Sequence, residues 1–194
     1  MTEMKALQEG VRRSLPELDE IKDPDLRKKV VEAWALSLSH SEFERIEDIS
    51  PAGVPGGQTM LRGTQADHIR GVTRMASAMV DELEHLLGPI GVDRNLLLAC
   101  ALCHDVGKPF EFSQRNQARW QATPATVGRP SVRHPVYGAY IALTVGLPEA
   151  VVHTAAAHSH EGDLVTRSLE NTVVHWADEA YWDILERAGL VRSD

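Results

Sequence analysis

Apolar side chains recur along this chain mainly at intervals of three and four residues, the period of an amphipathic helix. After Asp23, which is placed to cap a helix beginning at Pro24, such a pattern runs to about Ser39. Its inward positions are Leu26, Val30, Val31, Trp34 and Leu38. Strand-like alternation of Val, Ile and Thr is scarce, so the pattern predicts an all-α protein.

The same pattern divides the rest of the chain into helices and breaks. Residues 1–20 form at most a short helix interrupted by Pro16, and residues 50–63 form a turn-rich loop. Further helices are predicted from the capping pair Thr64 and Asp67 to Gly88, from Asp93 to His104-Asp105, from Pro135 to Gly146, from Pro148 to near His158, and over 167–188. Residues 109–133 read as an irregular stretch that is long for a connection, and such loops are usually functional or disordered.

The size and composition of the chain fit one compact unit. It has 194 residues, of which 43% are hydrophobic, and this is enough apolar surface for a real core. We expect residues 1–60 to form an N-terminal helical extension packed on a core domain of residues 61–194. The core domain is predicted to be a helical bundle around an interior cavity.

Charge and targeting signals restrict where the protein works. The net charge of -8 argues against a nucleic-acid binder, which needs a basic surface to replace counterions. No apolar run approaches the ~20 residues needed to cross a membrane, and the first residues lack a signal-peptide core. Two cysteines do not make a disulfide framework. We therefore expect a cytoplasmic protein that binds neither nucleic acid nor membranes, with a homo-oligomer left open.

An apolar helix-length run ends in His104-Asp105, followed by Gly107 and Pro109, which stop the helix. An imidazole and a carboxylate both donate to divalent cations, and at a helix end two adjacent side chains can reach one ion. Taken alone, this pair would be a histidine at a helix end beside a solvated aspartate. The sequence contains further metal-competent residues, however, at His68, His134, His158, His160 and Asp178.

The phase of two of these residues supports a metal site. His68 shares a helix face with Val72 and Met75, so it points inward, and a buried histidine needs a partner. Asp178 lies on an otherwise apolar helix, where a buried carboxylate needs a compensating cation. His158 fits the helix phase of its neighbours better than His160 does. His160 therefore remains either an alternative ligand or a substrate contact.

The ordered set His…His-Asp…His…His…Asp resembles the HD-domain superfamily of metal-dependent phosphohydrolases. The resemblance covers residues 64–188 and rests on four segments: His68-Ile69-Arg70-Gly71-Val72, His104-Asp105-Val106-Gly107-Lys108, His134-Pro135-Val136-Tyr137-Gly138-Ala139, and Ala177-Asp178. The third segment is similar to the HPxxGA segment of members that bind two metals. The sequence His160-Glu161-Gly162 departs from the GYP of cyclic-di-GMP phosphodiesterases, which disfavours that activity.

This resemblance implies a site for two divalent or mixed-valent ions, of which Fe or Mn suit mixed nitrogen and oxygen ligands best. The implied ligands are His68, His104, Asp105 and Asp178 for one ion, and Asp105, His134 and His158 for the other. It also implies catalytic roles for Asp105, as the bridge between the ions, and for Lys108. The leading hypothesis is hydrolysis of a phosphate ester such as a nucleotide. The alternative is a mixed-valent diiron oxygenase, and a non-catalytic regulatory module is disfavoured by the full ligand set.

The segment between two of these ligands is cationic. Residues 108–133 carry a local net charge of +4, which contrasts with the acidic chain as a whole. The simpler interpretation is a solvated loop. The functional interpretation is a rim that binds a small anionic substrate through Lys108, Arg115, Arg119 and Arg133, because guanidinium groups match phosphate and carboxylate oxygens.

One further motif competes for His104. Cys100 and Cys103 complete a C-x-x-C-H, the attachment motif of c-type haem. Haem attachment would require export and would leave Asp105 and the other histidines unexplained. The two sulfurs lie three residues apart within an apolar helix, as ordinary buried cysteines do. We therefore expect neither haem nor a zinc ribbon.

Overall fold

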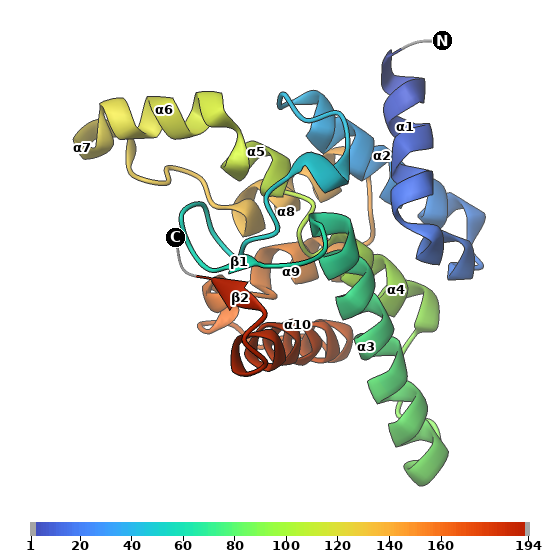
Figure 1. Cartoon of the computed structure of the whole chain (residues 1–194). Helices are drawn as coiled ribbons and strands as arrows, with labels where there is room; N and C mark the ends of the chain where they lie inside the picture. Colours follow the sequence, from blue (N-terminus) through green and yellow to red (C-terminus); the bar gives the residue numbers. More distant parts are fainter. Residues whose placement is uncertain (1–2, 193–194) are drawn as a thin grey trace.

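The computed structural model describes residues 3–192, and helices dominate it (Figure 1). The α-helices are α1 (Glu3–Ser14), α2 (Pro24–Ser39), α3 (Gln65–Leu87), α4 (Arg94–Cys103), α5 (Lys108–Phe112), α6 (Gln114–Ala122), α7 (Pro124–Val127), α8 (His134–Thr144), α9 (Glu149–Ala157) and α10 (Leu169–Arg187). Short 3-10 turns lie at Pro16–Glu20, Ile46–Asp48 and His160–Gly162. The all-α prediction is confirmed.

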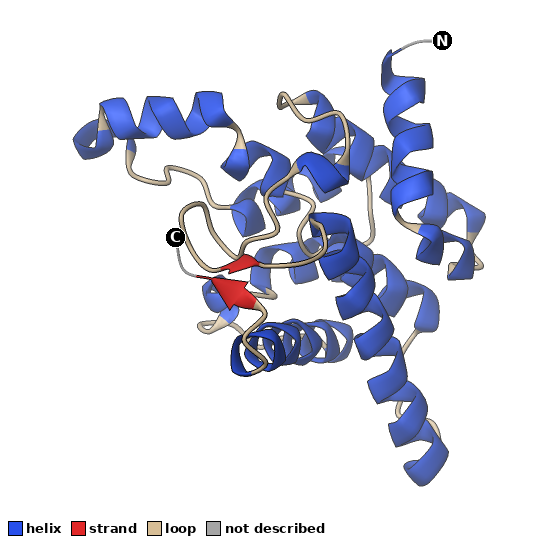
Figure 2. Ribbon diagram, viewed as in Figure 1, coloured by secondary structure: helices blue, strands red, loops and turns tan. Residues whose placement is uncertain are grey.

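Two sequence predictions need correction. Residues 109–133 are not irregular, because α5, α6 and α7 occupy most of this stretch, and α6 with α7 projects from the body of the molecule (Figure 1). Proline at or near the first position of α5 and α7 starts these short helices. The loop 50–63 also contains a strand, β1 (Thr59–Met60), which pairs antiparallel with β2 (Val191–Arg192) (Figure 2).

Helix starts follow the caps that the sequence indicates. The Asp23 carboxylate accepts hydrogen bonds from the backbone N–H groups of the first turn of α2, and Asp93 does the same for α4. Thr64 and Asp67 form the expected capping box at α3, each side chain accepting from the other's backbone N–H. These caps fix where α3 and α4 begin, and therefore where His68 and His104 lie along them.

One hydrophobic cluster joins both ends of the chain. It runs from Leu7 in α1 to Ala177 in α10, so the first helices share the core of the later ones. Trp34 of α2 is fully buried and donates its indole N–H to the carbonyl of Leu102 at 2.8 Å. Ser37 similarly donates to the carbonyl of Val106. Helix α2 thus supports the turn that carries His104-Asp105, while the boundary near residue 60 stays a prediction.

The cysteines lie inside this core. Cys100 and Cys103 are free thiols on α4 with no exposed surface. Burial raises the pKa of Cys100 to about 12 and raises that of Cys103 as well, which keeps both thiols protonated and unreactive. The C-x-x-C-H motif therefore packs the core. Within residues 3–192, no helix combines the length and apolar character that a bilayer crossing requires.

Candidate metal centre

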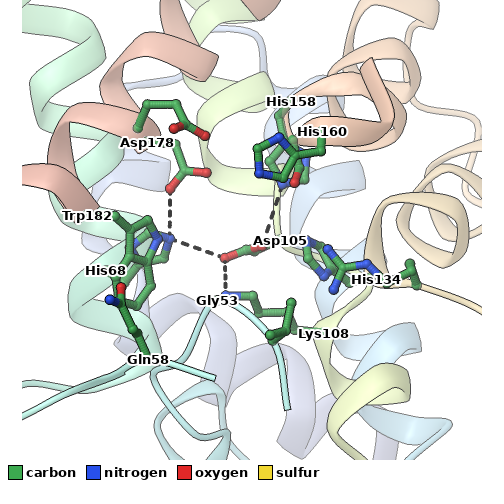
Figure 3. A pocket seen from close by; sticks show the side chains of 14 residues that line it. Gly53, Gln58, His68, Asp105, Lys108, His134, His158, His160, Asp178 and Trp182 are labelled. Carbon is green, nitrogen blue, oxygen red and sulfur yellow. Dashed lines mark ion pairs between the residues drawn. The ribbon is translucent and has the colours of Figure 1, made fainter. Parts of the chain in front are cut away.

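Five elements and the turn after α4 deliver the metal-competent side chains to one place, and Figure 3 shows His68, Asp105, His134, His158 and Asp178 of this set. His68 comes from α3, His104 caps the end of α4, His134 opens α8, His158 caps the end of α9, and Asp178 comes from α10. Asp105 lies in the turn after α4, at the centre of the group. His68, His104, Asp105, His134 and His158 are each at most 3% exposed. The structure therefore brings together the whole predicted ligand set.

Two glycines allow the elements to approach this closely. A Cβ on Gly107, in the turn after Asp105, would lie 2.0 Å from the carbonyl oxygen of His134. A Cβ on Gly71, three residues after His68, would lie 2.4 Å from the ring of Tyr181 on α10. At Gly107 the obstacle is backbone, so only glycine fits, whereas a larger residue at Gly71 would have to displace the ring of Tyr181. Gly107 thus lets the His104-Asp105 turn sit against α8, and Gly71 lets α10 bring Asp178 beside His68.

The two carboxylate oxygens of Asp105 face different histidines. Oδ2 lies 3.2 Å from Nε2 of His68 and 3.3 Å from Nε2 of His104. Oδ1 lies 3.4 Å from Nε2 of His134 and 3.8 Å from Nε2 of His158. Asp178 adds Oδ1 at 3.3 Å from Nε2 of His68. The result is two adjacent groups, His68–His104–Asp105 and Asp105–His134–His158, that share one carboxylate.

These separations fit side chains that hold cations. Ligands about 2.1 Å from one ion lie roughly 3.0–3.4 Å from each other in octahedral or tetrahedral geometry. The Nε2 atoms of His68 and His104 are 3.3 Å apart, and in the absence of a shared proton or cation their lone pairs would repel. Oδ1 of Asp178 is buried and has no hydrogen-bond donor within residues 3–192. A cation between these atoms would satisfy them all.

Three of the four candidate histidines are also held by a hydrogen bond in the orientation that a ligand needs, whereas Nδ1 of His68 has no partner within residues 3–192. Nδ1 of His104 lies 2.6 Å from the carbonyl oxygen of Ala101, and Nδ1 of His158 lies 3.1 Å from that of Thr154. A carbonyl can only accept, so Nδ1 carries the proton and Nε2 presents its lone pair to the centre. His134 makes the corresponding bond to the carboxylate of Glu111. Such partners fix the tautomer of metal-binding histidines.

Burial and charge set the protonation states. Burial raises the pKa of Asp105, but the charges of Lys108 and His104 outweigh it and hold this pKa well below its usual range. Burial lowers the pKa of His68, and it lowers that of His158 to about 3, helped by the neighbouring histidines. Burial also lowers the pKa of His104, but the charge of Asp105 outweighs it and leaves this pKa raised, so a metal ion there would have to displace a proton. An ionised Asp105 and neutral His68 and His158 are the forms that bind metals.

The comparison with known families agrees with this arrangement. The family model for the HD domain matches residues 66–181. The chain belongs to the HD-domain family. A curated relative, dihydroneopterin 2',3'-cyclic phosphate phosphodiesterase of Methanocaldococcus jannaschii, is 30% identical over 169 residues, which are 84% of this chain and 65% of the relative. The chain thus spans less than two thirds of that relative's length. No solved structure matches the chain.

The HD centre opens into a pocket of about 270 Å³ (Figure 3). Its walls come from the loop before β1, from α3, from the turn after α4 and the start of α5, from the start of α8, from the end of α9 and from α10. The lining residues are Gly53, Val54, Gln58, His68, Asp105, Lys108, Arg133, His134, His158, Ser159, His160, Asp178, Glu179 and Trp182. Two fixed cations, Lys108 and Arg133, therefore border the same space as the candidate ligands.

Lys108, the lysine of the HDVGK motif, is buried and has every donor occupied. Its ammonium lies 2.9 Å from Oδ2 of Asp105, 2.8 Å from the carbonyl of Ala52 and 3.4 Å from Oε1 of Gln65. An ammonium group has three N–H donors, so these contacts use all of them. Lys108 thus ties Asp105 to the loop that carries Gly53 and Val54. Its direct contact with substrate stays a prediction.

The predicted arginines divide into two groups. Arg133 borders the pocket, where Nη1 donates to Glu111 and Nε donates to Glu161. Arg115 and Arg119 are exposed on α6, outside the pocket lining. The helical structure of residues 114–122 explains the difference, because it extends this segment away from the centre (Figure 1). The structure does not bring Arg115 and Arg119 to the site.

His158 and His160, the two candidates for one ligand position, lie in different surroundings. The side chain of His158 is 1% exposed and faces Asp105, whereas that of His160 is 86% exposed. Nδ1 of His160 lies 3.5 Å from the carboxylate of Asp163. His158 ends α9, and the chain turns outward before the 3-10 turn that begins at His160. The geometry places His158 among the candidate ligands and His160 at the pocket mouth.

Two polar residues that the sequence analysis did not select support the centre. Gln65, the first residue of α3, is fully buried and donates its side-chain amide to Oδ2 of Asp105 at 2.8 Å. Glu111 on α5 is fully buried and accepts from His134 and Arg133. Burial raises the pKa of Glu111, but the hydrogen bond from His134 and the charge of Arg133 leave it lowered. The sequence shows that Glu111 lies shortly after His104-Asp105, but it does not show that Glu111 contacts His134.

Proposed function

We propose that the protein is a metal-dependent phosphohydrolase that cleaves a phosphate ester of a small anionic substrate. The observation that carries this proposal is Asp105, whose two oxygens face two separate histidine groups inside a pocket. A carboxylate in this position would bridge two divalent ions, for which Fe and Mn are the best candidates with these ligands. His68, His104, Asp105 and Asp178 would hold one ion, and Asp105, His134 and His158 the other.

Ions bound there supply Lewis acidity, which lowers the pKa of a water molecule and neutralises charge on phosphoryl oxygens. The protein itself supplies orientation and fixed charge. Within residues 3–192, no hydrogen bond engages Nη2 of Arg133, so its N–H groups are left for a substrate oxygen. Gln65 and Lys108 hold Asp105 in place while the reaction proceeds. Overall, water adds to phosphorus, one ester P–O bond breaks, and the departing oxygen takes up a proton.

The pocket and the relative support a proposal for the substrate class. A volume of about 270 Å³ is just below the usual range of small-molecule pockets, which favours a compact substrate over a polymer. The relative from Methanocaldococcus jannaschii is named for a 2',3'-cyclic phosphate diester. We propose a cyclic phosphodiester or phosphomonoester of a nucleotide-sized molecule. We further propose that nucleic acids and membranes are not partners, and the oligomeric state stays open.

The test begins with metal-free protein reloaded with Mn²⁺ or Fe²⁺ under anaerobic conditions. A panel of 2',3'-cyclic nucleotides, 3',5'-cyclic nucleotides and nucleoside monophosphates is followed by ³¹P NMR. We expect hydrolysis of at least one member by the reloaded protein and none by Asp105→Asn, which keeps the shape of the side chain but removes its charge. Circular dichroism checks that the variant is folded. Absence of hydrolysis across the panel, together with substrate-dependent O₂ uptake by the Fe-loaded protein, would favour the diiron oxygenase instead.

A further inference from the structure

Glu111 is a buried carboxylate outside the candidate ligands, and its two oxygens contact His134 and Arg133. Its Oε2 accepts from the backbone N–H of His134 at 2.8 Å and also contacts Nδ1 of the same residue. Its Oε1 accepts from Nη1 of Arg133 at 2.8 Å. The side chain of Glu111 has no exposed surface. One carboxylate therefore holds the first residue of α8 by its backbone and by its ring.

This contact differs in kind from those of the other candidate ligands. His104 and His158 donate from Nδ1 to neutral backbone carbonyls. His134 donates to a charged carboxylate, which gives a stronger hydrogen bond and a more electron-rich ring. The preceding residue, Arg133, offers no side-chain cap to α8, so Glu111 also takes the capping role at this helix.

We propose that Glu111 is a positioning residue that sets the affinity of the His134–His158–Asp105 group for its metal ion. It keeps the proton on Nδ1 of His134, so that Nε2 presents its lone pair toward Oδ1 of Asp105, 3.4 Å away. It also strengthens His134 as a donor. The inference rests on the proposed two-ion site, and Glu111 contacts neither the ions nor the substrate.

Glu161, the second carboxylate that pairs with Arg133, supplies a matched control. The guanidinium of Arg133 pairs with two carboxylates, Glu111 and Glu161, at 2.8 and 2.9 Å. Only Glu111 also contacts His134. Replacing Glu161 by Gln removes one partner of Arg133 and one negative charge beside the pocket, and it leaves the contact between Glu111 and the ring of His134 in place. Glu111→Gln removes the same amount of charge together with the carboxylate that holds His134.

The experiment measures binding of Mn²⁺ to metal-free protein by titration calorimetry and equilibrium dialysis. We expect two ions in the wild type, and in Glu111→Gln a second ion that binds about 10- to 100-fold more weakly, which is the usual effect of losing such a partner. Glu161→Gln should bind both ions as the wild type does. A Glu111→Gln variant with unchanged affinity for both ions would overturn the inference and leave the two-ion site intact. A wild type that binds fewer than two ions would overturn the two-ion site, and the inference with it.

A measurement on the wild type covers the case in which Glu111→Gln does not fold. In the Zn²⁺-loaded protein, ¹⁵N-edited NMR of labelled histidine reports which ring nitrogen carries the proton. We expect His134 to be protonated at Nδ1, with a proton resonance shifted further downfield than those of His104 and His158, because its acceptor is charged. An unprotonated Nδ1, or a resonance like that of the carbonyl-bonded histidines, would refute the role of Glu111.

Discussion

The replacement Gly107→Ala should damage both the stability and the metal site, because it pushes the HD turn away from α8. The new Cβ would lie 2.0 Å from the carbonyl oxygen of His134 and 2.6 Å from the backbone nitrogen of Gly138. Both obstacles are backbone atoms, so no side chain can rotate out of the way. Relieving contacts this short requires the turn and α8 to separate by about 1 Å or more, and overpacking of this kind typically costs about 1–3 kcal/mol.

For a protein of this size, each kcal/mol lowers Tm by about 2–4 °C, so we expect Gly107→Ala to melt about 2–12 °C below the wild type. The same separation lengthens the 3.4 Å span between Nε2 of His134 and Oδ1 of Asp105. A binding site of this kind tolerates displacements of only about 0.5 Å, so the second metal ion should bind more weakly.

Thermal melting by circular dichroism and metal analysis after dialysis measure the two effects. Gly10→Ala is the matched control, since a Cβ on Gly10 in α1 meets only the flexible end of Arg13 at 3.9 Å. That variant should be as stable as the wild type or slightly more so, because alanine is the better helix former. A Gly107→Ala protein that melts with the wild type and keeps both ions would refute the close-packing argument.

Further predictions follow from the same geometry. His158→Ala should lose metal and His160→Ala should keep it, as measured by elemental analysis, and the reverse result would exchange their roles. Arg133→Gln should raise KM for an anionic substrate more than Arg115→Gln does, because only Arg133 borders the pocket; equal effects would place α6 at the substrate. The pKa of Glu111 is lower in the folded protein than its unfolded value of 4.5. The ionised carboxylate therefore stabilises the fold above pH 4.5, and this stability is lost as the pH falls through the lower folded pKa. Glu111→Gln should therefore flatten the acid-induced loss of stability of the metal-free protein, followed by denaturant titration at several pH values, whereas a Glu111→Gln curve parallel to that of the wild type would contradict this account.

The metal-competent residues were accessible from the sequence because their order and local context carry the information. His68 and Asp178 stand at inward positions of apolar helices, and His104-Asp105 ends another such helix. Short-range rules also predicted the caps at Asp23, Asp93 and Thr64, because a cap is made within one turn. These features depend on neighbours in the chain, so a single sequence is enough to find them.

The substrate-binding residues were harder to predict from the sequence, because they depend on the direction in which each segment runs in the folded protein. Counting charges over residues 108–133 treated Lys108, Arg115, Arg119, Arg129 and Arg133 alike. The helical fold of α6 carries Arg115 and Arg119 away from the pocket, and of the five only Lys108 and Arg133 line it. Even those two are engaged by carboxylates, which a charge count over one segment does not reveal.

Tertiary structure alone decided which polar residues support the centre. Gln65 and Asp105 are forty positions apart, and Glu111 and His134 are twenty-three apart, and each pair meets only when the helices pack. Sequence patterns report which face of a helix is apolar, because that depends on residues three and four apart. The partner that a buried side chain meets across the core depends on the packing of several helices at once. The sequence by itself therefore determined the longer helices that carry the candidate ligands and the order of these ligands. The packing of α5 against α8 determined what holds His134.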